Sequence, residues 1–589
     1  MSVDDNNNRQ TAAKLVSKEL LELCKSDSLS EKGLREIIER HPHDHHVSDY
    51  QFFLWACINE RVTERVIRCL FEYFPVAISA HHDGWSALHY ACCNKNMTLN
   101  IVQLLIDAAP NSVRSISNSG RMPLHCLCYA KNGDEIAVVE MLKLLIEKHP
   151  EAIRHATNKG SLPIHLALRS KNVTLNIIQL LIDAAPDSIR SVDEDGDTPL
   201  HNLCMNEELD ERAAMEILKL LIEKHPEAVR HANNDGDLPI HFAGSPEFSR
   251  ILIEAYPGSE RIAGHSGWLP FNSACYRGTF ATVKYLYKIY PDAINHRTRD
   301  GYHPIHHAIV GVRHRIHPKA AVGVVKFLLD CDPSAKLQKV RGKSLLQLAC
   351  SLEYVDLSIE AGVQVQVINT IYDAYPEAIE DNRISSNIDR WGQQVQSFIS
   401  SQLAYSRQAK DIRLMTTPDD NGQLPLHTAL QNDVRLGSIK LLVKGNPPAL
   451  QSPDNNGALP LHMACRHHES SHVVRYLVGL DTTTLDAVDR EGNTALHYAC
   501  RGANYETIAM LVETYDAVSV SKRNAHGKLP INLLLESERV SDRESVEYTG
   551  SVFMLLTAYP EAIMNFNVTR QQANTASCSL QNGKKRKLG

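Results

Sequence analysis

Residues 196–201 read Gly-Asp-Thr-Pro-Leu-His, and this phrase recurs along most of the 589-residue chain. In the strict form Gly-x-x-Pro-Leu/Ile-His it begins at Gly120, Gly160, Gly196, Gly236, Gly301, Gly422 and Gly457, and looser copies begin at Gly84, Gly267, Gly342, Gly492 and Gly527. Successive glycines are separated by 36, 40, 36, 40, 31, 34, 41, 80, 35, 35 and 35 residues, so only the interval of 80 breaks the rhythm. Such a period indicates a repeat architecture rather than several separate globular domains.

A second landmark follows the first in several repeats. It is an apolar stretch that ends in Pro, an acidic residue and Ala or Ser, as in LLIEKHPEAI at 144–153 and LLIDAAPDSI at 180–189. Residues 100–115 nearly repeat as 176–191, at an offset of 76 residues. This offset indicates that two neighbouring repeats were duplicated together, which explains the alternation of 36 and 40.

Each repeat is expected to form two short antiparallel helices joined by turns. The glycine supplies the positive-φ position of a tight turn, and the Pro after it suits the first turn of a helix, where its missing N–H is not needed. The second helix, around Leu142 and Leu145, carries apolar residues at helical spacing and is ended by Pro150. Two such helices cannot bury their apolar faces alone, so the units are expected to stack into an all-α solenoid.

These motifs resemble the ankyrin repeat, in which a β-turn and two helices recur with a period near 33 and the sequence Thr-Pro-Leu-His-x-Ala. The best matches are Thr198 to His201 and the Gly-Asn-Thr-Ala-Leu-His run that ends at His497. The resemblance covers residues 50 to 566 and implies an ankyrin-repeat α-solenoid of stacked helix–turn–helix units with short β-turn loops.

Two features depart from the ankyrin pattern. The Thr that would cap the first helix is replaced by Leu or Met in many units, which removes a side-chain cap: Met122, Leu162, Leu238, Leu424 and Leu459. The second helix ends in Pro-Glu/Asp-Ala instead of Gly-Ala-Asp. We expect these changes to alter the helix ends and not the fold class.

The pattern divides the chain into five parts. Residues 1–48 are expected to form an N-terminal helical cap or degenerate repeat, 49–379 a first repeat block, 380–418 an inserted helical segment, 419–566 a second block, and 567–589 a disordered basic tail. This division predicts about fourteen repeat units in the whole chain, of which those at the N-terminus are atypical. Segment 380–418 is either a drifted repeat or an insertion; we favour an insertion and expect it to be the weak seam of the stack.

Composition excludes several classes of protein. Hydrophobic residues make up 43% and charged residues 22%, as in ordinary folded soluble proteins. No stretch approaches the ~18 consecutive apolar residues of a spanning helix, and the N-terminus lacks the pattern of a signal peptide. The net charge of −7 does not favour nucleic-acid binding. The 14 cysteines, several in an Ala-Cys context, are expected to be reduced and buried.

Catalytic motifs are absent from the sequence. It contains no P-loop, dinucleotide-binding, nucleophile-elbow, kinase or zincin motif, so we expect no enzyme activity and no cofactor. The histidine that recurs in the repeats could suggest metal or acid–base chemistry. The ankyrin resemblance implies instead a structural hydrogen bond from loop to helix, which we favour.

Denser groups of histidines are weighed in the same way. The His-rich run at residues 41–46 has no cysteine nearby, and we favour a solvated loop over a zinc site. The same preference applies to His467, His468 and His472, and to His314 with His317.

The leading hypothesis is a non-catalytic scaffold or adaptor that binds proteins along a concave solenoid surface. Specific contacts should come from positions that vary between units, namely the residue after the loop glycine and the residue after the Ala-Cys position. Aromatic and arginine side chains dominate interface energetics, so the protein-binding candidates are Trp85, Trp268, Tyr276, Tyr302, Arg466 and Arg501. For each aromatic side chain, packing against the adjacent loop remains the alternative.

The chain closes with a short basic run at Lys584, Lys585, Arg586 and Lys587, a type associated with nuclear targeting; the alternative is a solvated tail. Two further hypotheses are therefore a nuclear regulatory protein and an accessory subunit of an enzyme complex. We expect one or more unidentified protein partners, no membrane insertion, no nucleic acid and a monomer. The expected location is cytoplasmic, with the nucleus as the alternative.

Overall fold

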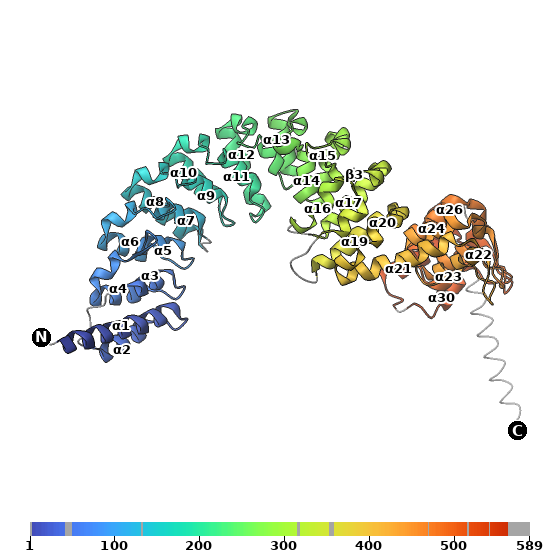
Figure 1. Ribbon diagram of the computed structural model, residues 1–589, viewed down its shortest axis with the longest axis horizontal. Helices are drawn as coiled ribbons and strands as arrows, with labels where there is room; N and C mark the ends of the chain where they lie inside the picture. The colour runs from blue at the N-terminus through green and yellow to red at the C-terminus, as the bar shows by residue number, and fades with distance from the viewer. Residues whose placement is uncertain are drawn as a thin grey trace, which may run out of the picture. The chain divides into compact units, whose positions relative to one another are not determined.

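The computed structural model describes residues 3–41, 50–130, 134–314, 318–352, 359–468, 470–514, 518–540 and 542–562. Within these ranges most residues are helical, and the helices follow one another as stacked pairs (Figure 1). The described strands are two short antiparallel hairpins, in which β1 (His81–His82) pairs with β2 (Trp85–Ser86) and β3 (Lys339–Val340) with β4 (Lys343–Ser344). The predicted all-α class is confirmed.

The first helix of each pair, here called the inner helix, is short, apart from α1, and packs against the inner helix of a neighbouring pair in most of the stack. The inner helices are α1 (Val3–Lys25), α3 (Gln51–Ile58), α5 (Ala87–Cys93), α7 (Pro123–Tyr129), α9 (Pro163–Leu168), α11 (Pro199–Met205), the 3₁₀ helix η6 (Pro239–Phe242), α14 (Pro270–Arg277), α16 (Pro304–Val310), α18 (Leu345–Cys350), α23 (Pro425–Gln431), α25 (Pro460–His467), α27 (Ala495–Gly502) and α30 (Pro530–Glu536).

The second helix of each pair, the outer helix, returns antiparallel to the first. The outer helices are α2 (Glu31–Arg40), α4 (Glu64–Tyr73), α6 (Leu99–Ala108), α8 (Glu135–Lys148), α10 (Leu175–Ala184), α12 (Glu211–Lys224), α13 (Pro246–Ala255), α15 (Phe280–Ile289), α17 (Ala320–Cys331), α19 (Ile359–Ala374), α24 (Leu436–Gly445), α26 (Ser471–Leu480), α28 (Tyr505–Thr514) and α31 (Val546–Ala558).

A short 3₁₀ turn after most outer helices is a feature that the sequence did not predict. In the fourth pair the α-helix ends at Lys148, and Pro150 then opens the turn η3 (Pro150–Arg154) instead of merely ending the helix. Ala152 and Ile153 in this turn are buried, so the Pro-Glu/Asp-Ala ending carries part of the core. Related short turns are η1 (Pro75–Ser79), η2 (Pro110–Arg114), η4 (Pro186–Arg190), η5 (Pro226–Arg230), η7 (Ser259–Arg261), η9 (Pro291–Asn295), η11 (Pro333–Leu337), η12 (Pro376–Glu380), η14 (Pro447–Gln451) and η15 (Thr482–Leu485).

The loop glycines behave as the repeat predicts, since all twelve have positive φ. Gly160 shows a second reason for glycine at this position. A Cβ atom there would lie 2.9 Å from the backbone nitrogen of Glu194 in the next loop. This close approach lets the Glu194 N–H donate to the carbonyl oxygen of Lys159, at 2.9 Å, and the same bond joins Asn158 to Ser119, at 3.1 Å. Neighbouring loop tips are therefore joined backbone to backbone.

The helices form two compact units, residues 1–324 and 325–589, and each is described separately. In the first unit one hydrophobic core runs from Val16 to Leu252 along successive pairs. In the second unit a core runs from Met415 to Ala562.

Within the second unit, residues 382–416 form extra helices between two repeats. They are α20 (Asn382–Ser385), η13 (Ile388–Arg390), α21 (Gln393–Lys410) and α22 (Ile412–Thr416). Helix α21 packs against α24 and also contacts α19. The buried Ser438 hydroxyl donates to Gln402 Oε1, at 2.6 Å, and lies 2.9 Å from the Tyr372 hydroxyl. The domain boundaries given above, including 380–418 as an insertion, stay predictions.

Candidate protein-binding surface

A buried histidine in most inner helices ties one repeat to the next. His89 Nδ1 accepts a hydrogen bond from the Ser86 backbone N–H, at 3.1 Å, and His89 Nε2 lies 3.0 Å from the Arg121 carbonyl oxygen in the following repeat. Because Nδ1 accepts, the ring is neutral and Nε2 donates. The same arrangement recurs at His125, His165, His201, His241, His427, His462 and His497.

Burial keeps these imidazole rings neutral. It lowers the pKa of His89, His125, His165 and His201 from 6.5 to about 4. Both nitrogens of each ring are occupied by backbone groups. The histidines therefore form a structural ladder, as the sequence predicted, with no nitrogen turned to a metal or substrate.

This ladder holds the inner helices in a row, and a groove of about 950 Å³ runs along their C-terminal ends. It crosses five consecutive repeats of the first unit. Its lining includes Glu60 after α3, Lys95 after α5, Tyr129 in α7, Arg169 after α9 and Met205 in α11. A groove that spans several repeats suits an extended partner, because each repeat adds one short segment of contact.

The side chains of the groove combine an aromatic anchor with charges. Tyr129 is 48% exposed, and the Arg121 guanidinium lies over its ring, 5.5 Å from the centroid. Arg169 pairs with Asp193 at 2.7 Å. Tyr129 directly follows the Ala-Cys position of its repeat, but neither Tyr129 nor Arg169 is among the residues predicted from the sequence to bind a partner. Both stand six residues after the inner helix begins, and this shared register is the signal that could have found them.

Three predicted candidates meet at one place in the first unit. The Trp268 ring lies 5.3 Å from Tyr276, and both Trp268 (4.1 Å) and Tyr302 (5.4 Å) contact the ring of His307, as measured between centroids. Trp268, Tyr276 and Tyr302 are half-buried, and they come from two consecutive repeats. We call these four residues the aromatic cluster.

His307 is not predictable from the repeat, because it follows the recurring His306 and most units have no histidine at this second position. It is buried at the base of the cluster, and its Nε2 has no hydrogen-bond partner among the residues the structure describes. Burial and the neighbouring histidines lower its pKa to about 3, so the ring is neutral.

Trp85 lies apart from the aromatic cluster. Its ring packs 5.6 Å from His89 and 5.5 Å from Tyr90, both in the helix that follows it. The side chain is half-buried, which fits the packing alternative as well as a contact role.

Arg466 and Arg501 lie near each other in the second unit, together with Arg539, which was not predicted. Arg539 Nη1 donates to the Arg466 carbonyl oxygen, at 3.2 Å. Burial lowers the pKa of Arg466, and the charges of Arg501 and Arg539 lower it further. Cations at helix C-termini are favoured by the helix dipole, which accounts for Arg466 and Arg501 at the ends of α25 and α27. Binding by any of the six predicted residues stays a prediction.

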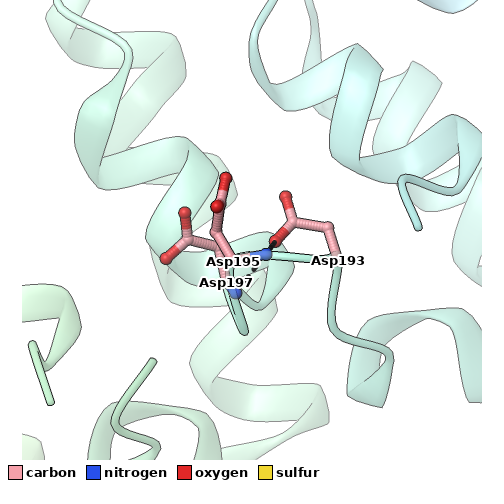
Figure 2. Close-up of side chains that lie close together, drawn as sticks. All are labelled: Asp193, Asp195 and Asp197. Atoms are coloured by element: carbon pink, nitrogen blue, oxygen red, sulfur yellow. Dashed lines mark hydrogen bonds between the residues drawn. The ribbon is translucent and has the colours of Figure 1, made fainter. Parts of the chain in front are cut away.

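Three carboxylates, Asp193, Asp195 and Asp197, lie close enough together to suggest a cation site (Figure 2). Asp193 Oδ1 accepts the backbone N–H groups of Asp195, at 3.1 Å, and Asp197, at 3.0 Å, while its other oxygen pairs with Arg169. Burial raises the pKa of Asp197, whose carboxylate accepts from Asn233 at 2.8 Å.

The same turn recurs in other loops. Asp419, Asp454 and Asp489 each accept the N–H groups two and four residues later. The Asp193 carboxylate therefore stabilises its own loop, as these other aspartates do. The group of Asp193, Asp195 and Asp197 does not support a metal site.

Three sequence-based hypotheses involve residues outside the described ranges, and one of them is the grouping of His314 with His317. Most of the His-rich run at 41–46 lies in the range 42–49, and the basic run at Lys584, Lys585, Arg586 and Lys587 lies beyond residue 562. Nuclear targeting by the basic run stays a prediction.

Comparisons with known proteins bear on the family. Residues 397–486 and 426–524 match the family model described as ankyrin repeats (3 copies), and residues 83–115 match the model of a single ankyrin repeat. No curated protein matches the chain. Among the described helices, none has both the length and the apolar composition to cross a membrane.

Proposed function

Because the chain is built from ankyrin repeats, we propose that it is a non-catalytic scaffold that binds protein partners through the surface of its inner helices. Ankyrin repeats indicate an interaction scaffold as the kind of function. The finer proposal is that binding uses the groove along α3 to α11 together with the aromatic cluster, both in the first unit.

The aromatic cluster carries this proposal. Large rings that remain half-exposed on a rigid framework are typical anchors of protein interfaces, because they bury much area and lose little conformational entropy. Trp268 and Tyr276 sit on one inner helix and the loop before it, while Tyr302 and His307 come from the next repeat. A partner that covers them would span two repeats.

The experiment compares partner capture by the full chain and by Trp268→Ala/Tyr276→Ala. Affinity capture from native lysate, followed by mass spectrometry, identifies partners of the unmodified chain. We expect the double variant to lose at least one of them, with the far-UV circular dichroism spectrum unchanged. Phe553→Ala, which removes an exposed ring from outer helix α31, is the control and should retain every partner. If the double variant keeps all partners and loses stability, the rings serve packing only.

The basic run at the C-terminus supports a second candidate function, that of a nuclear regulatory protein. We propose a cytoplasmic location for the chain, with import into the nucleus if residues 568–589 are recognised. Fusing these residues to a fluorescent reporter tests the idea, because a working signal would concentrate the reporter in nuclei. No enrichment would remove the basis for nuclear targeting. A role as accessory subunit of an enzyme complex is a special case of the scaffold proposal, in which the bound partner is an enzyme.

A further inference from the structure

The outer helices of the second unit enclose a cleft of about 710 Å³. Its lining comes from the last turns of α17, from α19 and α24, and from α26 with the residues just before it. The cleft therefore lies on outer helices, away from the inner-helix surface of the proposed function.

The two walls of the cleft meet although they are far apart in sequence. Lys326 Nζ in α17 lies 3.3 Å from His472 Nε2 in α26, across 146 residues. Two other outer helices, α19 and α24, lie between them in the order of the stack and contact each other. The outer helices thus curve around this space instead of splaying apart. This curvature occurs where α21 is inserted between the repeats.

Two of the acidic groups in the cleft already have partners. Asp373 accepts from Arg435 Nη2, at 3.1 Å, and from the Gly437 backbone N–H, at 2.9 Å. Asp433 Oδ1 lies 3.0 Å from His468 Nδ1. These contacts hold α19 to α24 and the loop before α24 to the residues before α26, and they leave Asp330 as the remaining exposed carboxylate of the lining.

Positive charge on the walls is not neutralised in the same way. Lys326 and Arg475 are exposed, and neither has a carboxylate within ion-pair distance among the residues the structure describes. Deeper in the cleft, Lys440 lies over the Tyr476 ring, 5.7 Å from the centroid, and donates to the Asp373 carbonyl oxygen. Burial lowers the pKa of Lys440, so a nearby anion would relieve the cost of its charge.

Apolar groups line the space between these cations. Leu329, Leu436 and the ring of Tyr476 contribute carbon surface to the cleft. A ligand with charge alone would leave this surface in water, whereas a ligand with one apolar side chain would cover it.

We propose that this cleft binds an acidic peptide segment of a partner protein, with an apolar side chain against Leu329, Leu436 and Tyr476 and carboxylates toward Lys326, His472 and Arg475. Charge complementarity selects the acidic segment, because Lys326 and Arg475 carry positive charges that no carboxylate pairs with among the residues the structure describes. The Lys326 ammonium already donates to His472 Nε2, at 3.3 Å, so a carboxylate beside this pair would be held by a charged donor in a fixed position. The site is independent of the inner-helix surface.

The test selects short random peptides on the full chain and synthesises the enriched sequences with a fluorescent label. We expect them to be acidic with one apolar residue, and their Gln-for-Glu and Asn-for-Asp counterparts to bind about tenfold more weakly by fluorescence anisotropy. Lys326→Glu/Arg475→Glu should weaken binding by at least the same factor. The control Arg212→Glu/Lys219→Glu reverses two charges on outer helix α12 of the first unit and should bind as the unmodified chain does.

Three outcomes would overturn the proposal: selection of neutral or basic peptides, equal binding by Lys326→Glu/Arg475→Glu, or no peptide enriched above background. A circular dichroism melt of each variant separates loss of binding from loss of folding. Trp268→Ala/Tyr276→Ala should keep the acidic peptides, so failure of this cleft and failure of the inner-helix surface are distinguishable.

Discussion

At the scale of single residues, Asn272 shows what the ladder histidine contributes. Asn272 stands where most repeats have histidine, and its Oδ1 accepts from the Leu269 backbone N–H at 3.0 Å, as His Nδ1 does elsewhere. Its Nδ2 is buried and has no hydrogen-bond partner among the described residues. The shorter asparagine side chain performs the cap within the repeat but does not reach the next one.

Asn272→His is expected to stabilise the first unit. The new Nε2–H would reach the carbonyl oxygens of His296 or Tyr302, which hold the positions of the acceptors used in other repeats. A hydrogen bond to a previously unpaired buried site contributes about 1 kcal/mol. Urea unfolding followed by circular dichroism measures the difference.

His201→Asn provides the matched control for this substitution. His201 Nδ1 accepts from the Thr198 backbone N–H, at 3.2 Å, and His201 Nε2 lies 3.0 Å from the Asp237 carbonyl oxygen. Asparagine keeps the first contact and loses the second, so the control should lose about 1 kcal/mol of stability. No loss at this position would show that histidine acts only within its own repeat.

The role of a single residue could be predicted from the sequence where that residue recurs in the repeat motif. The loop glycine and the ladder histidine recur in fixed register, so their roles follow from the repeat. His307 was missed because its importance depends on Trp268, Tyr276 and Tyr302 meeting in space. A repeat pattern does not report which variable positions come together.

At the scale of elements, the histidine ladder makes the stacking of helices depend on pH. Folding holds the pKa of His89, His125, His165 and His201 at about 4, whereas the exposed value is 6.5. The unfolded chain therefore binds more protons between these values. The stabilisation is complete above pH 6.5 and is lost as the pH falls toward 4.

The free energy of unfolding should fall on acidification from pH 6.5 to 5, by up to about 1.4 kcal/mol per pH unit for each such histidine in the cooperative unit. Urea midpoints measured across this range test the slope. His165→Asn removes one titrating group and should make the slope shallower. A flat profile for the unmodified chain would contradict a neutral buried ladder.

The helix pairs were largely predictable and the turns after them were not. Apolar spacing and the Pro positions define the inner and outer helices. The 3₁₀ turn that follows, as in η3, depends on burial of Ala152 and Ile153 against neighbouring helices. A Pro that only ends a helix and a Pro that also begins a 3₁₀ turn give the same sequence pattern, so the sequence does not distinguish them.

At the scale of the whole molecule, stability should be a sum of interfaces between neighbouring repeats. The extra helices at residues 382–416 interrupt the regular order of helix pairs. At the repeat before them, Gln347 replaces the ladder histidine, and its buried Nε2 has no partner among the described residues. The Arg383 guanidinium donates to the Gly342 carbonyl oxygen, at 2.8 Å, in this region. The connection across residues 382–416 then relies on α21, through the buried contact of Gln402 with Ser438, and on the direct contacts of α19 with α24.

Limited proteolysis should cut first within 380–418. Ser438→Ala should speed this cleavage about fivefold, because it leaves the Tyr372 hydroxyl and Gln402 Oε1 with one partner fewer, a cost of about 1 kcal/mol. Ser400→Ala on the exposed side of α21 is the control and should leave the rate unchanged. If the first cleavage sites are spread evenly over the other repeats, segment 380–418 is not the weakest part of the stack.

The number and order of repeats were predictable at this scale, but the cleft between α17 and α26 was not. It depends on how the outer helices curve around the insertion, and nothing in the spacing of Lys326, His472 and Arg475 brings them together. On such a scaffold, a binding site forms where side chains at variable positions of different repeats come together in space.

The ladder also bears on how such a chain can evolve. Most ladder histidines and most loop tips bond to a backbone carbonyl, a group that every repeat supplies whatever its side chains. A repeat copied by unequal recombination can therefore form the same hydrogen bonds with the repeats on both of its sides. The near-identical segments 76 residues apart are consistent with this history. Genes that encode such bonds can lengthen or shorten by whole repeats while selection acts separately on the exposed residues.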